Sequence, residues 1–281
     1  MRAAPEEGPC VTGLVKRLNR LRTIAALFLL AAAGPALAQD NAAPSGQASG
    51  DPMSARLSAE KVGDVETGSF STGDNNLAFS LQPYGDRYLL RFTDSPEDYV
   101  LTVERVLLGG RILRYDTGVT ALRVSVWGGM TLYTESAPGG VPATRVGDDA
   151  TIPRPGVSHN DLVAALTDEE NHLAYTRQLH LHFSADPKIL AGTDDNRGLA
   201  FDAMVSAAAG IERLLGAPAG LKALSGKFDM VRIVQGDKPG VTVSGKTLLV
   251  SYAPSAGAAG RASSRQVALQ LGKMLQIAEA G

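Results

Sequence analysis

Between residues 76 and 134, apolar and polar residues alternate with a period of two in short runs. The runs are LAFSLQP, DRYLLRF, DYVLTVER, RILRYD, VTALRVSV and MTLYTE, and Gly, Pro or Asp residues separate them. This pattern is typical of short antiparallel strands. We expect turns at residues 109–110, 116–118 and 128–129, because glycine tolerates the positive φ that tight hairpins require. A meander or a small barrel would account for the pattern.

The period changes beyond the prolines near residue 155, where helical spacing begins. Ser158 followed by Asp161 is a capping-box pattern, and the leucines that follow it fall on one helical face. We predict further helices at residues 196–215 and 264–278, each with an apolar stripe at helical spacing. The segments LHLHF, DMVRIV, VTV and TLLVSY between the helices read as strands.

These patterns predict an α+β fold. The antiparallel β-rich region takes residues 59–150, and a mixed α+β region takes residues 151–281.

The N-terminus has the order of a secretory signal peptide at residues 1–38: a basic stretch KRLNRLR, an apolar run TIAALFLLAAAG and small residues up to Ala38. The apolar run is about half the roughly 20 residues that span a bilayer, so we expect cleavage near Ala38 and no permanent membrane anchor. Residues 39–58 are mostly small and polar, which predicts a disordered spacer. We therefore expect a periplasmic or secreted protein.

The chain without its leader is acidic and free of cysteine. Residues 1–38 contain five of the 27 Lys and Arg residues and two of the 29 Asp and Glu residues, leaving 22 against 27. Cys10 is the one cysteine, so no disulfide or thiolate site is expected after cleavage. A net charge of −5 makes nucleic acid an unfavourable partner, because phosphate backbones are bound through Lys and Arg.

The segment GVTVSGKT at residues 240–247 matches the phosphate-loop pattern G-x-x-x-x-G-K-[ST]. A working phosphate loop opens a helix, whereas the residues after Lys246 read TLLVSYAP and alternate as a strand does. We therefore interpret residues 244–246 as a hairpin turn with Lys246 in solvent, and we do not expect a nucleotide site.

Asp116-Thr117-Gly118 is the triplet that aspartic peptidases use, in which two carboxylates share a proton. This chain has one such triplet, so a homodimer would have to supply the second. A turn between two strands explains the same letters without catalysis. Asp116 is therefore a weak catalytic candidate.

His180 and His182 would project from one face of a predicted strand, a spacing found among metal ligands. Asp186 or His172 would have to provide a third ligand. The opposite face carries leucine and phenylalanine, so an amphipathic strand with two exposed histidines explains the pattern without a metal. We expect no cofactor.

The glycine-rich segment before the last predicted helix leads into Arg261, Ser263, Ser264 and Arg265. Free amides at a helix N-terminus between two arginines could hold a small anion such as phosphate or carboxylate. The alternative is that Ser263 or Ser264 simply caps the helix.

Trp127 is the only tryptophan in the chain and precedes two glycines. Large aromatic residues at such positions commonly cover a hairpin from inside the core. We expect Trp127 to be buried.

The segments LGGRILRYDTGVTALRVSVWGGMTLYTESAPGGVPA and GRASSRQVA resemble a family of uncharacterised secreted proteins of alphaproteobacteria, a domain-of-unknown-function family. The resemblance covers most of the chain after the leader and implies no catalytic residues.

The sequence thus favours a non-enzymatic envelope protein that binds a small anion or another envelope component, or that has a structural role. The alternative is a periplasmic hydrolase, which would act as an aspartic peptidase through Asp116 or with a metal at His180 and His182.

Overall fold

The structure is a computed structural model and describes residues 64–73, 77–148, 152, 156–217 and 219–277. The predicted signal peptide and spacer at residues 1–58 lie outside the described residues. The described residues all belong to one compact unit, Gly50–Gly281.

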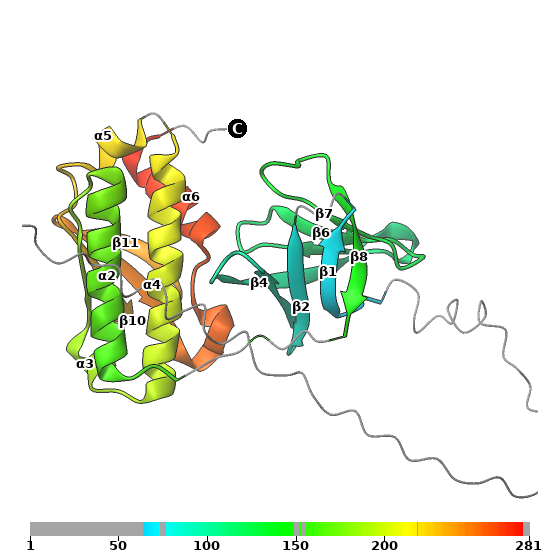
Figure 1. Ribbon diagram of the computed structural model, residues 1–281, viewed down its shortest axis with the longest axis horizontal. Helices are drawn as coiled ribbons and strands as arrows, with labels where there is room; N and C mark the ends of the chain where they lie inside the picture. Colours follow the sequence, from blue (N-terminus) through cyan, green and yellow to red (C-terminus); the bar gives the residue numbers. More distant parts are fainter. Residues whose placement is uncertain (1–63, 74–76, 149–151, 153–155, 218, 278–281) are drawn as a thin grey trace, which may run out of the picture. The chain divides into compact units, whose positions relative to one another are not determined.

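The alternating first half of the chain folds into a closed eight-stranded barrel, drawn in cyan to green in Figure 1. Each strand pairs antiparallel with the next one along the chain, and the last strand pairs antiparallel with the first. The strands are β1 (Gly68–Thr72), β2 (Ala78–Tyr84), β3 (Arg87–Phe92), β4 (Asp98–Arg105), β5 (Arg111–Arg114), β6 (Thr120–Val124), β7 (Met130–Leu132) and β8 (Val141–Gly147).

The barrel interior is filled by alternate residues of these strands, as the period of two predicts. Aromatic rings pack inside it: Phe70 stacks on Phe79 with centroids 5.2 Å apart, and Tyr99 meets Tyr115 edge to face at 5.2 Å. The buried leucines of this core are Leu81, Leu90, Leu101, Leu113, Leu122 and Leu132.

The sequence pattern did not predict β1 and β8, the two strands that close the barrel. β1 reads GSFST and offers one large apolar side chain, Phe70. β8 contains Pro142 and buries none of its residues fully. Neither segment has a strong alternating signal. The two strands are recognised from their pairing with each other, in which Phe70 lies opposite Arg145.

The three predicted turns in the barrel are confirmed. A 3-10 turn, η1 (Leu107–Gly109), connects β4 to β5. Gly109, Gly118 and Gly128 have φ values of 89°, 84° and 84°, in the left-handed region that glycine accepts without a steric penalty.

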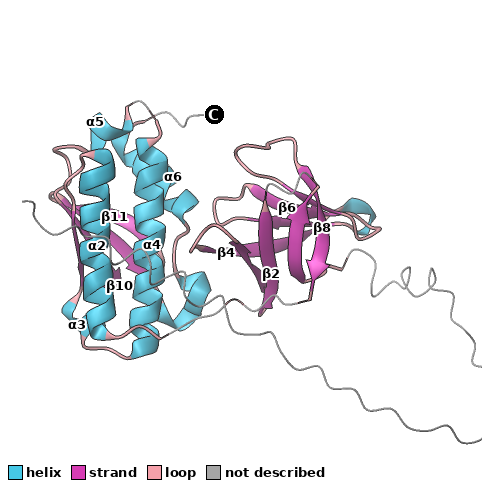
Figure 2. Ribbon diagram, in the orientation of Figure 1, coloured by secondary structure: helices cyan, strands magenta, loops and turns pink. Residues whose placement is uncertain are grey.

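The second half combines helices with a mixed sheet, which confirms the α+β fold class (Figure 2). The sheet has the order β11-β12-β10-β9, with β9, β10 and β12 parallel and β11 antiparallel to β12. The elements of the second half are α2 (His159–Arg177), β9 (His182–Ala185), α3 (Pro187–Leu190), α4 (Asp194–Leu215), α5 (Gly220–Leu224), β10 (Met230–Gln235), β11 (Gly240–Ser244), β12 (Thr247–Tyr252), η2 (Pro254–Gly260) and α6 (Ser264–Leu275).

The helix starts follow their capping residues. Ser158 Oγ accepts a hydrogen bond from Asp161 N at 3.2 Å, as the capping-box pattern predicts. Helix α4 begins two residues before the predicted 196 because Thr193 caps it, accepting from Asn196 N at 3.3 Å. Helix α6 begins at Ser264 as predicted, but it ends at Leu275, before the predicted end at residue 278, because Gln276 adopts the left-handed conformation of a C-cap.

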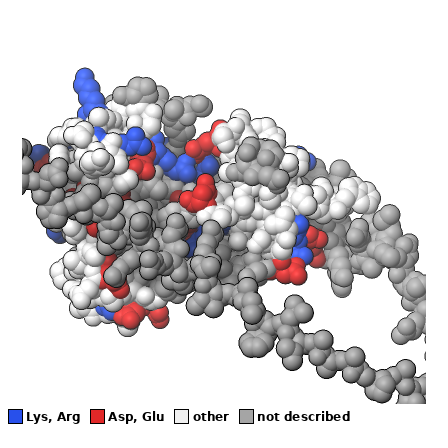
Figure 3. Space-filling model, viewed as in Figure 1, with Lys and Arg blue, Asp and Glu red and all other residues white. Residues whose placement is uncertain are grey.

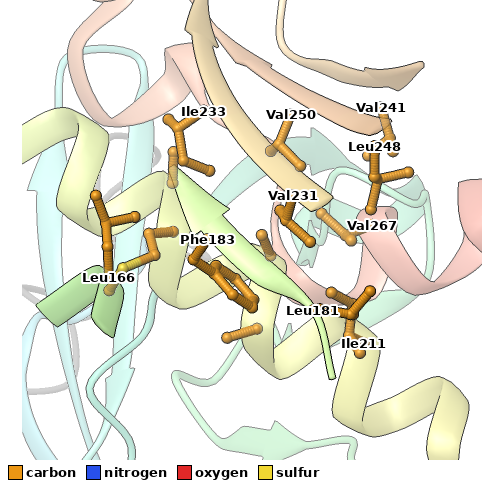
Figure 4. Close-up of a cluster of buried hydrophobic side chains, with 14 of the residues drawn as sticks. Leu166, Leu181, Phe183, Ile211, Val231, Ile233, Val241, Leu248, Val250 and Val267 are labelled. Atoms are coloured by element: carbon orange, nitrogen blue, oxygen red, sulfur yellow. The ribbon is translucent and has the colours of Figure 1, made fainter. Parts of the chain in front are cut away.

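Helices α2, α4 and α6 pack on the sheet around one hydrophobic core, shown in part in Figure 4. Phe183 of β9, Ile211 of α4 and Val231 of β10 all lie within it. Gly210 lets α4 approach α6 closely, because a Cβ at this position would lie 2.6 Å from Val267 Cβ. Within the described residues, no helix combines the length and apolar character needed to cross a bilayer.

The phosphate-loop pattern lies on a hairpin, as the sequence predicts. Ser244 pairs with Thr247, and Gly245 between them has a φ of 60°. Lys246 is 64% exposed and lies 3.0 Å from the Asp229 carboxylate. A strand, β12, follows instead of a helix, so no helix N-terminus is available to hold phosphates.

Candidate functional site

The N-terminus of α6 brings together the two segments that the sequence offered as separate candidates. Asp116, on the turn between β5 and β6, accepts hydrogen bonds from Ser263 N at 2.8 Å and Ser263 Oγ at 2.6 Å. Glu97, just before β4, accepts from Ser264 N and Ser264 Oγ, both at 2.6 Å. Carboxylates of the chain itself therefore occupy the amides that an external anion would use.

A chain of donors supports the buried carboxylate of Glu97, which is 3% exposed. Arg213 Nε donates to Ser264 Oγ at 3.0 Å, and that hydroxyl donates to Glu97. Arg213 also donates to the Tyr99 hydroxyl at 3.2 Å. Burial and, after it, the negative charge of Glu97 raise the pKa of Tyr99 to about 12. Glu97 escaped the sequence analysis because it lies in an unpatterned loop.

The two arginines of the predicted anion site also have partners within the chain. Arg261 donates to Ser206 Oγ at 2.9 Å and to the Asp98 backbone carbonyl, and its side chain is 3% exposed. Arg265 lies 3.1 Å from the Glu135 carboxylate and 4.3 Å from the centre of the Tyr115 ring. Both guanidinium groups thus hold parts of the chain together.

These contacts indicate a structural role for Asp116 at the N-terminus of α6. Both of its carboxylate oxygens accept from the residue that caps α6, whereas an aspartic peptidase uses a carboxylate to share a proton with a second carboxylate and to activate water. On the face drawn in Figure 3, acidic and basic side chains lie beside one another and do not form a large area of one sign.

His180 and His182 are exposed on one face, and Leu181 and Phe183 are buried on the other, as predicted. Strand β9 begins at His182, three residues later than the predicted strand. His182 Nδ1 lies 2.7 Å from a Glu170 carboxylate oxygen.

The two residues considered as a third metal ligand have other roles. His172 lies 3.2 Å from Glu212, and Asp186 caps α3 by accepting from Lys188 N at 2.9 Å. In the part of the chain that the structure describes, no three His, Cys, Asp or Glu side chains gather as a metal site would require.

A recess of about 370 Å³ lies on the barrel between η1 and the hairpin that joins β6 to β7. Trp127, at the tip of this hairpin, is 79% exposed, and Leu107 of η1 is 94% exposed. The prediction that Trp127 is buried is therefore wrong. Arg123, Thr131 and Tyr133 provide polar groups to the same recess. We call this the Trp127 recess.

Hydrogen bonds order the backbone of the turn that carries Trp127. Ser125 N donates to Gly129 O at 2.8 Å, and Gly128 N donates to Ser125 O at 3.0 Å. Gly129 N donates to Ser125 Oγ at 3.0 Å. The indole is thus presented on an ordered hairpin of a closed barrel, which lowers the entropy lost when a ligand binds.

The turn signal contained the information on the exposure of Trp127. Strand β6 ends at Val124, and Trp127 lies in the turn before Gly128, where side chains commonly project into solvent. The turn predicted at residues 128–129 was a better guide than the usual burial of tryptophan.

Comparisons with known proteins identify a family but no activity. Residues 52–271 match the model of a family described as a domain of unknown function, DUF4908. No curated protein and no solved structure matches the chain.

Proposed function

The chain belongs to the DUF4908 family, and we propose that it is a non-enzymatic binding module whose ligand occupies the Trp127 recess. The observation that carries this proposal is the 79% exposure of Trp127 at a hydrogen-bonded turn. An exposed indole on an ordered turn provides a large apolar contact area at low entropic cost, which is why tryptophan is common at the centre of binding sites.

A binding role is favoured over catalysis by the contacts of the catalytic candidates. Asp116 accepts from Ser263, and His182 pairs with Glu170. The hydroxyls of Ser263 and Ser264 donate to carboxylates and are held on residues that are 5% and 0% exposed. We therefore do not propose a hydrolase.

We further propose that this binding takes place in the bacterial envelope. Support comes from residues 1–38, whose basic, apolar and small-residue segments are ordered as in a secretory leader. Finding uncleaved chain in the cytosol would contradict this location.

Retention on separated envelope fractions tests the proposed function. The purified chain without its leader is mixed with murein sacculi, outer-membrane vesicles and soluble periplasmic glycans, and the bound amount is measured by sedimentation or gel filtration. Trp127→Ala is expected to weaken retention on one fraction about tenfold, because truncation of a central aromatic anchor commonly costs more than 1 kcal/mol.

Tyr175→Ala is the matched control, because Tyr175 of α2 is also aromatic and 86% exposed. It is expected to bind as the unmodified chain does. If every fraction retains the Trp127→Ala chain as well as it retains the unmodified chain, the proposed function is refuted.

A further inference from the structure

We propose that the Trp127 recess binds a saccharide that carries a carboxylate, with the Arg123 guanidinium pairing with the carboxylate and the indole covering one face of the sugar ring. This inference rests on the proposed function and adds the chemical class of the ligand.

The guanidinium of Arg123 is exposed and is available to a partner from outside the described chain. Among the other barrel arginines, Arg114 lies 2.9 Å from Glu104 and Arg91 bonds Asp98, whereas Arg105 of β4 has no ion pair with the described residues. The side chain of Arg123 has no hydrogen bond or ion pair with any residue that the structure describes, although Arg123 lines the recess beside Trp127. A guanidinium pairs with a carboxylate through two parallel hydrogen bonds, so the recess is complementary to that group.

The amides near Arg123 do not favour phosphate. Phosphate sites usually combine a cation with several free backbone amides. In the hairpin beside the recess, the amides of Ser125, Gly128 and Gly129 all donate within the turn. One guanidinium beside a hairpin that keeps three of its amides within the turn matches a carboxylate better than a phosphate or a nucleic-acid backbone, which requires a row of cations.

The rest of the recess suits a sugar ring. The face of an indole carries negative charge density, which attracts the electron-poor C–H groups on one side of a pyranose. Thr131 and Tyr133 line the recess, and their hydroxyls have no hydrogen-bond partner among the residues described, so they are available to bond sugar hydroxyls.

The size of the recess favours a small ligand over a protein partner. Its volume of about 370 Å³ lies at the lower end of the range of small-molecule sites. A stable protein interface buries roughly 800 Å² on each partner, which a single recess of this size does not provide. A monosaccharide or a disaccharide has the appropriate size for the recess.

The fluorescence of Trp127 reports binding at this site alone, because the chain has no other tryptophan. The purified chain is titrated with disaccharides of galacturonic, glucuronic and mannuronic acid, and with the neutral hexose disaccharide that corresponds to each. At least one acidic disaccharide is expected to change the emission and to bind about tenfold more tightly than its neutral counterpart, as a charged hydrogen bond commonly contributes.

Arg123→Ala is expected to remove this preference, so that the acidic and neutral disaccharides bind alike. Arg123→Lys is expected to restore part of it, because lysine keeps the charge but not the two parallel donors. Arg232→Ala is the control, since Arg232 is an exposed arginine of β10 away from the recess residues.

The proposal is overturned if none of the three acidic disaccharides binds more tightly than its neutral counterpart, or if Arg123→Ala leaves the preference unchanged. Binding of a glutamate-rich peptide in place of every saccharide would also overturn it. In each case, loss of envelope retention by the Trp127→Ala chain would still support the proposed function. The two proposals can therefore fail separately.

Discussion

The N-terminus of α6 and the Trp127 recess both contain charged and aromatic side chains, but those side chains differ in their partners. At α6, Asp116 and Glu97 bond the capping serines, and Arg261 bonds Ser206 and a backbone carbonyl. At the recess, Arg123 has no such contact with the described residues. Satisfied groups stabilise a fold, whereas exposed groups without partners are free to bind a ligand. The predictions below follow from this difference.

The largest loss of stability is expected for Glu97→Ala. This change leaves the Ser264 amide and the Ser264 hydroxyl without their buried acceptor, which costs about 3 kcal/mol. Urea unfolding measures the difference, with Glu104→Ala as a control because Glu104 is 58% exposed in its pair with Arg114. A loss equal to that of the control would show that the α6 N-terminus does not depend on Glu97.

Alkaline pH is expected to reduce stability through Tyr99. Its pKa is raised from 10.0 to about 12 in the folded chain, so the contribution is complete below pH 10 and is lost as the pH rises towards 12. A shift of this size corresponds to roughly 2 to 3 kcal/mol.

Tyr99→Phe separates this contribution from those of other tyrosines. The variant is expected to be less stable near pH 8, because Arg213 loses an acceptor, but its stability should fall less steeply between pH 10 and 12. Identical slopes for the two chains in urea unfolding would rule out the role given to Tyr99.

A smaller effect is expected for Asp116→Asn. The side-chain oxygen of asparagine still accepts one hydrogen bond from Ser263. The free energy of unfolding is therefore expected to fall by about 1 kcal/mol, similar to the loss of a helix cap. No hydrolytic activity is expected to depend on the change. If the unmodified chain cleaves peptides and the variant does not, the aspartic-peptidase alternative would replace the structural role.

The smallest effect on stability is expected for Trp127→Ala. An indole that is 79% exposed contributes little to the barrel core, so the change is within about 0.5 kcal/mol. Thermal unfolding checks this, and a loss above 2 kcal/mol would indicate that Trp127 packs as a core residue.

The sequence predicted the elements with strong periodicity and missed those that depend on distant pairing. The α+β class, the six alternating strands and the capping of α2 by Ser158 followed from local pattern. Strands β1 and β8 did not, because they pair with each other across most of the barrel sequence. Barrel closure is a non-local property that a short window does not contain.

The same limit explains the candidate sites. Asp116 and Ser263 were both singled out, but the bond between them joins residues 147 positions apart. A local sequence pattern therefore could not show that these two residues meet. The prediction for Trp127 was wrong for another reason: a general tendency of tryptophan to be buried outweighed its place in the turn that follows β6.

Acrylamide quenching of the single tryptophan tests whether the recess is where this protein binds its ligand. We predict strong quenching of the free chain, because Trp127 is 79% exposed, and protection when the envelope fraction that retains the protein is added. Unchanged quenching while the protein is bound to that fraction would show that binding occurs elsewhere, and would contradict the role given to the Trp127 recess.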